Sequence, residues 1–452
     1  RRGGTNRGFA PPPTQDHPVK TAPVWAWLEG SSSPVRVGTL SRDEDAGTGE
    51  FQYDAEYLAA GGRALDPAQL RHRDARRPIT IRATDREGVP GIIADAGPDA
   101  WGRHVLAQDL GFEPDAWDAL VYSADDGAGN LAVGELGAKP AIECLDLVEL
   151  ADAIQRRQDG QPSRERRLVE RVLSPDTALG GAKPKATTLV DGFPWIAKFP
   201  ERGDPPNLPY YEAAALRMAG RLGIDSATVE VRSLPHGRSV LMVKRFDRLA
   251  DGARIPFASG LTALGPAAQA HGPARTYLRL AEALKTWTRQ KAPAPAVVEL
   301  WERLAFNALV GNGDDHPRNH GLLYTDGAWG LSPAFDVVPT FHPRDKVSLA
   351  MPFLSLSPSK RTAAVSAANL VRAAPAYGLP ADEARARLIQ MAQGIQTQWA
   401  GVLQELDAPG EVARETKPVL DWSATVLAEA ETLTAADMPP DKPKRRGWRW
   451  AP

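Results

Sequence analysis

Cysteine is almost absent from the sequence, since Cys144 is the one example among 452 residues. A lone thiol cannot form an internal disulfide, so the chain lacks the covalent framework of many small secreted proteins. Cys144 stands beside Leu145, and a free cysteine in such a setting favours buried packing over a role as nucleophile. We therefore expect a protein of a reducing compartment, the cytoplasm.

Long apolar runs and an excess of one charge are also lacking. No stretch reaches the roughly 18 apolar residues of a membrane-spanning helix. The Arg- and Pro-rich residues 1–22 lack the apolar core of a secretory signal, and we expect a disordered arm there. The 54 basic and 56 acidic residues give a formal net charge of −2, which provides no general attraction to nucleic acid or membranes. The basic residues 438–452 are expected to form a solvated tail, with contact to DNA or a partner as the alternative.

Three regions differ in their sequence pattern between these ends. Residues 23–145 combine strand-like segments at 24–40, 51–53, 79–81 and 91–93 with helical segments at 101–109 and 117–121. Residues 146–275 are rich in strands, and Asp191-Gly192 between two of them is a hairpin signal. Residues 276–437 are predominantly helical. The sequence therefore predicts an α+β fold in which an extra N-terminal α+β subdomain and a β-rich N-lobe precede a mostly helical C-lobe.

The strongest chemical pattern is G-N-G-D-D-H-P-R-N at residues 311–319, followed by S-P-A-F-D at 332–336. Asp314 and Asn319 stand five positions apart, and Asp336 follows seventeen positions later. Protein kinases use this order, with an Asp for the substrate hydroxyl and then an Asn and an Asp for Mg²⁺, a hard cation that prefers oxygen ligands. Each residue alone is typical of a turn. Together they predict a catalytic Asp314 and a metal pair, Asn319 and Asp336.

A buried lysine is the second element of the pattern. Lys198 lies within the apolar strand-like segment 195–199, where a charge needs a partner. Glu212 follows fourteen positions later, near the start of the next helix, and this matches the kinase ion pair between a strand lysine and a helix glutamate. The alternative is an edge-strand lysine and a glutamate that serves the helix dipole.

Two further segments could contact phosphate. In L-G-G-A-K-P-K-A at residues 179–186, the small residues would let the backbone approach phosphates, and either lysine would add charge. The nucleotide-binding candidates there are Gly180, Gly181, Ala182, Lys183 and Lys185.

In the loop 311–319, His316 is predicted to orient neighbouring groups. Arg318 is predicted to pair with phosphate or with Asp336. A zinc site of His316 and His320 is disfavoured because Pro317 breaks the helix that would align the two rings.

These motifs together resemble the HipA family, bacterial serine/threonine kinases that are the toxins of HipBA-type toxin–antitoxin modules. The resemblance spans about residues 23 to 435 and rests on six ordered motifs. The six motifs are L-G-G-A-K-P-K-A at 179–186, I-A-K-F-P at 196–200, the glutamate helix from Tyr211, V-K-R-F-D-R at 243–248, F-N-A-L-V-G-N-G-D-D-H-P-R-N-H at 306–320 and L-S-P-A-F-D-V-V-P at 331–339. The upstream segment G-I-I-A-D-A-G-P-D-A-W-G-R at 91–103 also resembles the N-terminal module of the family.

The resemblance implies a protein-kinase-like bilobal fold that uses ATP and Mg²⁺. It assigns Asp314 as the catalytic base, Asn319 and Asp336 as metal ligands and Lys198 as the nucleotide lysine. Residues Lys244, Arg245 and Phe246 would form the hinge whose backbone meets adenine. It further implies a protein substrate such as an aminoacyl-tRNA synthetase, growth arrest, and a HipB-like helix-turn-helix antitoxin that brings the complex to operator DNA.

One position departs from the family pattern. Relatives often carry an autophosphorylated serine two residues before the glycine pair, where this chain has Ala178. Thr177 and Ser174 are the remaining candidates for autophosphorylation, unless the switch is lacking. Two alternative functions also stay open: a catalytically idle corepressor that acts through a DNA-binding antitoxin, and a kinase for small molecules or lipids.

Overall fold

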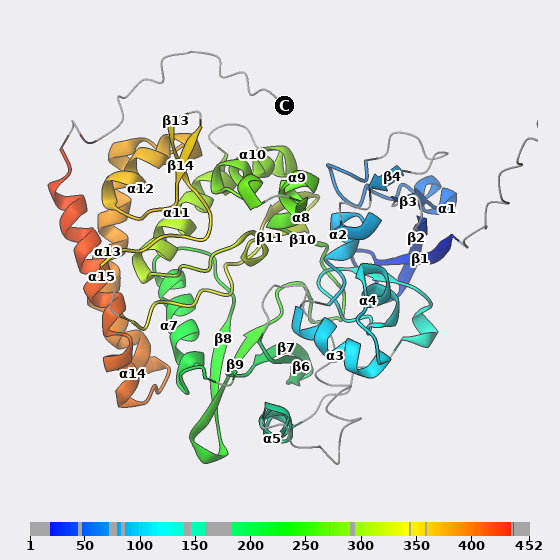
Figure 1. Cartoon of the computed structure of the whole chain (residues 1–452), viewed down its shortest axis with the longest axis horizontal. Helices are drawn as coiled ribbons and strands as arrows, with labels where there is room; N and C mark the ends of the chain where they lie inside the picture. The colour runs from blue at the N-terminus through cyan, green and yellow to red at the C-terminus, as the bar shows by residue number, and fades with distance from the viewer. Residues whose placement is uncertain are drawn as a thin grey trace, which may run out of the picture.

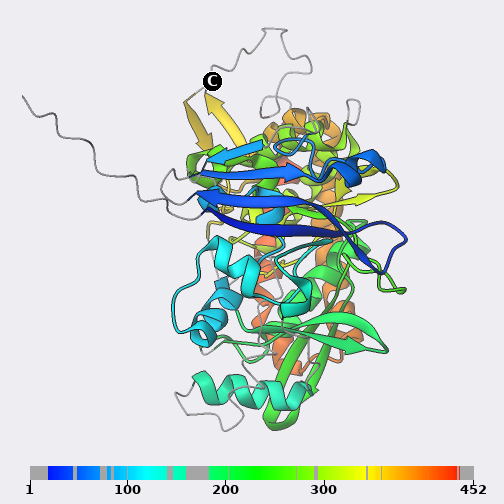
Figure 2. The same cartoon turned by 90° about the vertical axis from the view of Figure 1, so that its right-hand side faces the viewer.

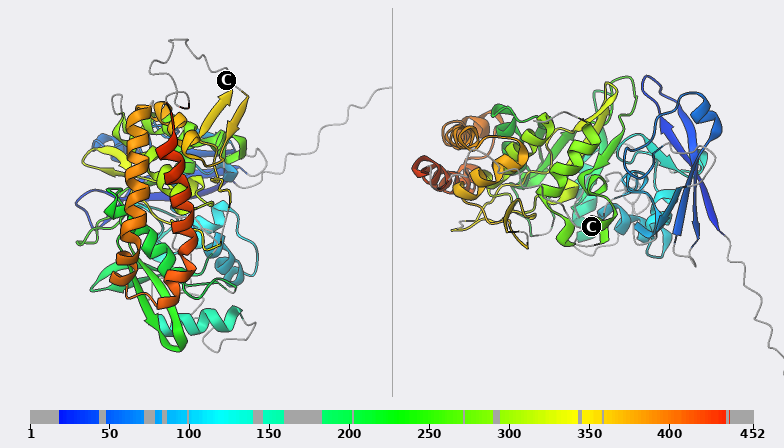
Figure 3. Two further views of the ribbon diagram at one scale, coloured as in Figure 1. Left: turned by 90° about the vertical axis from the view of Figure 1, so that its left-hand side faces the viewer. Right: turned by 90° about the horizontal axis from the view of Figure 1, so that it is seen from above.

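In the computed structural model the N-terminal subdomain lies beside the two lobes along the longest axis, and the N-lobe lies below the upper part of the C-lobe in the view of Figure 1. The structure describes residues 19–43, 48–71, 79–82, 86–98, 100–139, 146–158, 183–201, 203–270, 272–289, 294–342, 345–357, 359–434 and 437. The N-terminal subdomain occupies one end of this axis, and the long helices of the C-lobe occupy the other (Figures 1 and 3).

An antiparallel sheet forms the N-terminal subdomain, with strand order β4-β3-β2-β1-β5 (Figure 2). Its strands are β1 (Lys20–Trp27), β2 (Pro34–Asp43), β3 (Thr48–Tyr53), β4 (Ile79–Arg82) and β5 (Leu131–Val133). Its helices are α1 (Ala55–Ala59), α2 (Gly91–Ala94), α3 (Ala100–Leu110) and α4 (Ala116–Tyr122).

The strand predicted at residues 91–93 is wrong, because this segment begins the short helix α2. The carbonyl oxygen of Pro90 accepts hydrogen bonds from the N–H groups of Ile93 and Ala94, at 3.0 and 2.9 Å, and starts the helical turn. A run of three apolar residues has no periodicity that separates a buried strand from a buried helix.

The N-lobe is a four-stranded antiparallel sheet with order β6-β7-β9-β8, accompanied by two helices. Its elements are α5 (Leu147–Gln158), β6 (Lys185–Val190), β7 (Phe193–Lys198), α7 (Leu208–Arg221), β8 (Val229–Leu234) and β9 (Arg238–Lys244). The predicted hairpin between β6 and β7 is confirmed. Asp191 and Gly192 both have positive φ, 51° and 77°, as a two-residue turn that follows the strand twist requires.

The C-lobe is mainly helical, and α13 and α15 run together along its outer edge (Figure 3). Its helices are α8 (Gly260–Leu264), α9 (Pro266–Ala270), α10 (Tyr277–Thr288), α11 (Pro295–Val310), α12 (Ala367–Ala373), α13 (Ala381–Glu405), α14 (Gly410–Glu415) and α15 (Lys417–Thr432). Its strands are β10 (Phe257–Ser259), β11 (Gly321–Thr325), β12 (Ala328–Leu331), β13 (Leu354–Ser357) and β14 (Lys360–Thr362). Within the described residues, no helix combines the length and apolar character needed to cross a membrane.

Helix α11 lies in the core of the C-lobe and positions the motif loop. Its residues Leu300, Trp301 and Leu304 are fully buried, and the Trp301 indole donates a hydrogen bond to the Leu370 carbonyl oxygen at 3.1 Å. The helix ends at Gly311, whose φ of 74° is left-handed. Burial on all sides therefore fixes the point at which the chain enters the loop 311–320.

Candidate active site

Lys198, at the end of β7, lies between two carboxylates. Its Nζ is 2.7 Å from Glu212 Oε1 on α7 and 2.7 Å from Asp336 Oδ1 in the C-lobe. Glu212 belongs to the N-lobe and forms with Lys198 the lysine–glutamate pair that the spacing predicts. The same lysine also contacts Asp336, which is the predicted metal ligand. The contact with Asp336 also ties one lobe to the other.

The charges of these three groups set one another's pKa values. Burial opposes a charge on Lys198, but Asp336 and then Glu212 raise its pKa above the ordinary value, so the lysine stays protonated. Burial alone would raise the pKa of Asp336, and the nearby Lys198 ammonium reverses this and lowers it. Burial raises the pKa of Glu212 although Lys198 opposes the shift. The set therefore holds one cation beside an ionised Asp336 at neutral pH.

A cavity of about 270 Å³ opens beside this ion-pair set between the two lobes. Asp314 and His316 of the motif loop line it, opposite the lysines of the N-lobe. The full lining is Lys183, Lys185, Lys198, Phe199, Pro200, Glu201, Leu208, Pro209, Glu212, Leu241, Asp314, His316, Asp336 and Val338. Three lysines and four carboxylates line this cavity, so the lysines could contact a polyphosphate while the carboxylates would require a cation beside it.

The buried carboxylate of Asp315 holds the motif loop in place. Its Oδ2 accepts hydrogen bonds from the Tyr277 hydroxyl and from Asn307 Nδ2, the latter at 2.8 Å, and lies 3.1 Å from His320 Nε2. Its neighbour Asp314 is exposed, and within the described part of the chain only its backbone groups, not its carboxylate, form hydrogen bonds. The D-D pair therefore divides its roles: one carboxylate anchors the loop, and the other is free to meet a substrate.

The carbonyl group of Asp314 orients Asn319. Asn319 Nδ2 donates to the Asp314 carbonyl oxygen at 3.1 Å, which turns Asn319 Oδ1 away from that bond. This Oδ1 is buried and has no hydrogen-bond partner among the described residues. A buried amide oxygen without a donor is costly unless something else satisfies it. Together with the Asp336 carboxylate it gives two oxygen ligands, which fits Mg²⁺.

Asp336 itself has left-handed backbone, with a φ of 58°. Asp tolerates this conformation better than most residues. The preceding residue, Phe335, is buried and packs its ring against that of Phe246, with centroids 5.5 Å apart. The buried ring of Phe335 therefore helps to position the Asp336 carboxylate one residue away.

A second cavity, of about 370 Å³, adjoins the first on the side of the motif loop. Lys183, Asp314, Asp336 and Val338 line both cavities, so these residues stand where the two meet. The remaining lining of the second cavity is Gly311, Asn312, Gly313, Asn319, Pro339, Thr340, Phe341, His342 and Ser348. Two spaces on either side of Asp314 suit a donor and an acceptor of one transferred group.

Other predicted site residues lie in different surroundings. The N–H groups of Lys244 and Arg245 donate to the carbonyl oxygens of Thr228 and Pro194, at 2.9 and 3.2 Å. The Arg245 side chain points into a buried ion cluster and lines neither cavity. Of the three backbone N–H groups of the predicted hinge, that of Phe246 has no hydrogen-bond partner among the described residues, and Phe246 lines neither cavity.

Of the remaining predicted residues, two lysines line the first cavity, Arg318 lies on the surface, and the others fall in the undescribed part of the chain. Arg318 is exposed and lines neither cavity. Lys183 forms an ion pair with Asp204 at 2.8 Å, while Lys185 is buried. Gly180, Gly181 and Ala182, with Thr177 and Ser174, lie outside the described residues.

Sequence reasoning missed two anchors of the site. The first anchor is Asp315, which is visible in the sequence only as the second residue of the D-D doublet. Its partner Tyr277 lies 38 positions earlier, so the sequence does not indicate the contact. The second anchor is Glu415 on α14, whose Oε2 accepts from the Tyr211 hydroxyl at 2.7 Å and from Asn207 Nδ2 at 3.0 Å. Because Tyr211 precedes Glu212 on α7, Glu415 holds the helix that carries the ion-pair glutamate.

Comparisons with known proteins agree with this architecture. A family model described as the HipA-like C-terminal domain matches residues 177–399, and one described as the HipA N-terminal domain matches residues 27–134. "Putative kinase Y4mE" of Sinorhizobium fredii is 30% identical over 339 residues, which cover 67% of this chain and 75% of that protein. "Putative kinase Y4dM" of the same organism is 29% identical over 195 residues, 40% of this chain and 46% of that protein.

A solved structure gives the same fold. HipA of Shewanella oneidensis MR-1, in a complex with HipB and its operator DNA, superimposes with a TM-score of 0.63 at 20% identity. The match covers 90% of this chain and 96% of that one. The predicted α+β, kinase-like bilobal fold is confirmed. On the strength of both domain matches and of the Sinorhizobium relative, the chain belongs to the HipA family.

Proposed function

We propose that this chain is a serine/threonine protein kinase that depends on ATP and Mg²⁺. The observation that carries the proposal is the position of Lys198, held between Glu212 and Asp336 at the wall of a cavity that Asp314 also lines. Phosphoryl transfer requires charge neutralisation and alignment more than covalent chemistry. A fixed cation, an acidic group and two oxygen ligands around one cavity meet these requirements.

Each residue has a defined part in the proposed transfer. Lys198 would bind nucleotide phosphates, and Glu212 would keep its ammonium group in position. Asp314, exposed where the two cavities meet, would orient the acceptor hydroxyl and take its proton as the oxygen attacks the terminal phosphorus. Asn319 and Asp336 would hold Mg²⁺, which supplies further neutralisation of phosphate charge. The products are the phosphorylated hydroxyl and ADP.

The family supports a biological setting for this activity. We propose that the chain is the toxin of a type II toxin–antitoxin system and arrests growth by phosphorylating a translation-related protein such as an aminoacyl-tRNA synthetase. A HipB-like helix-turn-helix antitoxin would be its partner and would provide most of the contact with operator DNA. The Shewanella HipA, which is solved with HipB and operator DNA, supports this assignment.

Transfer of labelled phosphate tests the proposal. Wild-type protein is incubated with γ-labelled ATP, Mg²⁺ and a bacterial lysate, and phosphoamino acids are identified in the labelled proteins. We expect phosphoserine or phosphothreonine with the wild type and a loss of about 10²–10⁴-fold with Asp314→Asn. Asp407→Asn is the matched control, because Asp407 is an exposed turn residue remote from the cavities.

The same assay separates the alternatives. Label found on a small molecule or lipid instead of protein would make the chain a different kind of kinase. No label with wild-type protein, together with operator binding by a complex with the antitoxin, would make it a corepressor. Mass spectrometry of residues 174–188 after incubation with Mg-ATP would show whether Thr177 or Ser174 is modified.

A further inference from the structure

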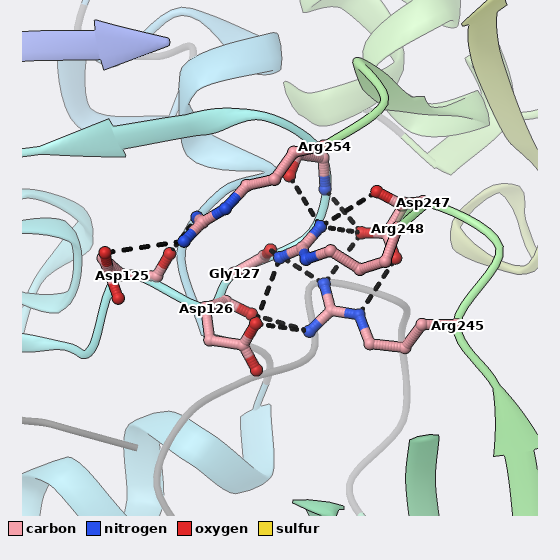
Figure 4. Close-up of polar contacts among 8 residues, drawn as sticks. Asp125, Asp126, Gly127, Arg245, Asp247, Arg248 and Arg254 are labelled. Atoms are coloured by element: carbon pink, nitrogen blue, oxygen red, sulfur yellow. Dashed lines mark hydrogen bonds and ion pairs between the residues drawn. The ribbon is translucent and has the colours of Figure 1, made fainter. Parts of the chain in front are cut away.

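A buried cluster of four charged side chains joins the N-terminal subdomain to the N-lobe (Figure 4). Asp126 comes from the loop between α4 and β5, and Arg245, Asp247 and Arg248 follow β9. Arg245 Nη1 lies 3.0 Å from Asp126 Oδ1, and Arg245 Nη2 lies 2.8 Å from Asp247 Oδ2. Arg248 reaches the same two carboxylates at 3.1 and 2.9 Å. Two positive and two negative charges therefore compensate one another out of contact with water.

The loop of the N-terminal subdomain is shaped to fit this cluster. The carbonyl oxygen of Gly127 accepts from both arginines, at 3.0 and 2.8 Å, and Gly129 N–H donates to Asp247 Oδ2 at 2.8 Å. A Cβ at Gly127 would lie 1.9 Å from the Ala96 carbonyl oxygen, which leaves no space for any other residue. The backbone of this loop is thus a part of the cluster as much as the Asp126 carboxylate is.

Phe246 carries the connection from the cluster to the candidate active site. It lies between Arg245 and Asp247, so the cluster fixes its backbone on both sides. Its ring contacts Phe257, with centroids 6.4 Å apart, and Phe335, with centroids 5.5 Å apart. Phe335 directly precedes Asp336, which also binds Lys198. An unbroken series of contacts therefore runs from the N-terminal subdomain to the metal-binding segment.

We propose that the N-terminal subdomain positions the metal-binding segment through this cluster, with Asp126 as a positioning residue for phosphoryl transfer. An effect of Asp126 on phosphoryl transfer rests on the proposed function, whereas its effect on the position of residues 333–338 does not. Asp126 lines neither cavity and touches no reacting group. It holds Arg245 and Arg248, and through them the backbone of Phe246. The subdomain is then a working part of the catalytic unit as well as a separate domain of the family.

Amide hydrogen exchange without nucleotide tests the positioning directly. The Ala334 N–H donates to the Asp225 carbonyl oxygen at 2.8 Å and reports on the metal-binding segment. Asp126→Asn should speed exchange of residues 333–338 at least tenfold while leaving helix α13 unchanged, which separates a local release from general destabilisation. Asp125→Asn is the matched control, because its carboxylate pairs with Arg254 at 3.5 Å and is 31% exposed. Unchanged exchange at 333–338 in a folded Asp126→Asn variant would overturn the proposal.

A second variant leaves the charges intact and serves if Asp126→Asn does not fold. Phe257→Leu removes the ring that supports Phe246 and should also speed exchange at 333–338 without affecting α13. If this variant exchanges like the wild type, the ring contacts carry no positioning and the proposal fails. In the transfer assay, both variants should raise the half-saturating Mg²⁺ concentration about tenfold, with a smaller change in kcat. A wild type that transfers no phosphate would refute the proposed function, while the exchange result would still decide the positioning.

Discussion

Replacing Lys198 by methionine keeps the volume of the side chain and removes its charge. In the wild type the ammonium group serves two carboxylates at 2.7 Å, and the three side chains are 8–21% exposed. At an effective dielectric constant near 20, each attraction at 2.7 Å amounts to about 6 kcal/mol, and desolvation offsets part of it. Removing one partner of a buried pair typically costs about 3–5 kcal/mol because the other charge stays uncompensated. We expect a loss of about 3 kcal/mol at pH 7, the lower end of that range.

The pH dependence of this loss identifies its cause. In the wild type Lys198 lowers the pKa of Asp336, so that ion pair stabilises the fold above the pKa of the unfolded carboxyl and is lost as pH falls through the lowered value. In Lys198→Met the cation is gone, and burial and mutual repulsion raise the pKa of at least one carboxyl. A group with a raised folded pKa binds protons more readily in the folded state. The variant should therefore recover stability relative to the wild type as the pH falls from neutral toward the ordinary carboxyl range.

Thermal unfolding measured by circular dichroism across this pH range gives the test. A loss of 3 kcal/mol corresponds to a fall in Tm of about 3 °C for a chain of 452 residues that unfolds as one unit. Phosphate transfer should fall about 10²–10³-fold, as expected when a preorganised charge is removed. Lys417→Met is the control, because Lys417 pairs with Asp421 on the surface at 66% exposure. A Lys198→Met variant that melts like the wild type at every pH would refute the electrostatic account.

Three further predictions concern the groups around the ion-pair set. Asn319→Leu removes an oxygen that has no hydrogen-bond partner among the described residues, and it also removes the bond from Nδ2 to the Asp314 carbonyl oxygen. These effects oppose each other, so Tm should change little while isothermal titration shows weaker Mg²⁺ binding. Asp315→Leu leaves the Tyr277 hydroxyl and other buried donors unpaired and should cost about 3 kcal/mol in urea unfolding. A midpoint equal to that of the wild type would rule out the anchoring role. Tyr211→Phe breaks the bond to Glu415 and should raise the KM for ATP several-fold with little change in Tm, and an unaltered KM would contradict its part in holding α7.

Local patterns predicted those features whose cause lies within a few residues. The Asp191-Gly192 turn could be predicted because Asp and Gly tolerate the positive φ angles that a two-residue hairpin turn needs, and both residues have them in the structure. The two-lobed order of strands and helices followed from hydrophobic period alone. The 91–93 segment was mispredicted because Pro90 and the surrounding core, not its own period, decide its conformation.

Long-range partners could not be predicted, because nothing near a residue in sequence identifies them. The D-D doublet contains both the loop anchor and the catalytic candidate, and packing against Tyr277 decides that Asp315 is the buried one. Asp126 and Arg245 are 119 residues apart in the chain, so their pairing becomes visible only in the fold. The roles of Asp314, Asn319 and Asp336 remain predictions until transfer is measured.

The contact between Lys198 and Asp336 has a consequence for how nucleotide would enter. The lysine is at the end of an N-lobe strand and the aspartate is in the C-lobe, so this ion pair connects the two lobes across the cleft. On the proposed function, Mg-ATP offers each partner a replacement: phosphate for the ammonium group and a metal for the carboxylate. Nucleotide binding is then an exchange of ionic partners, with little change in the number of compensated charges. Because the ion pair must be broken, such an exchange would lower the affinity for Mg-ATP. The same ion pair would keep both side chains aligned before the nucleotide binds.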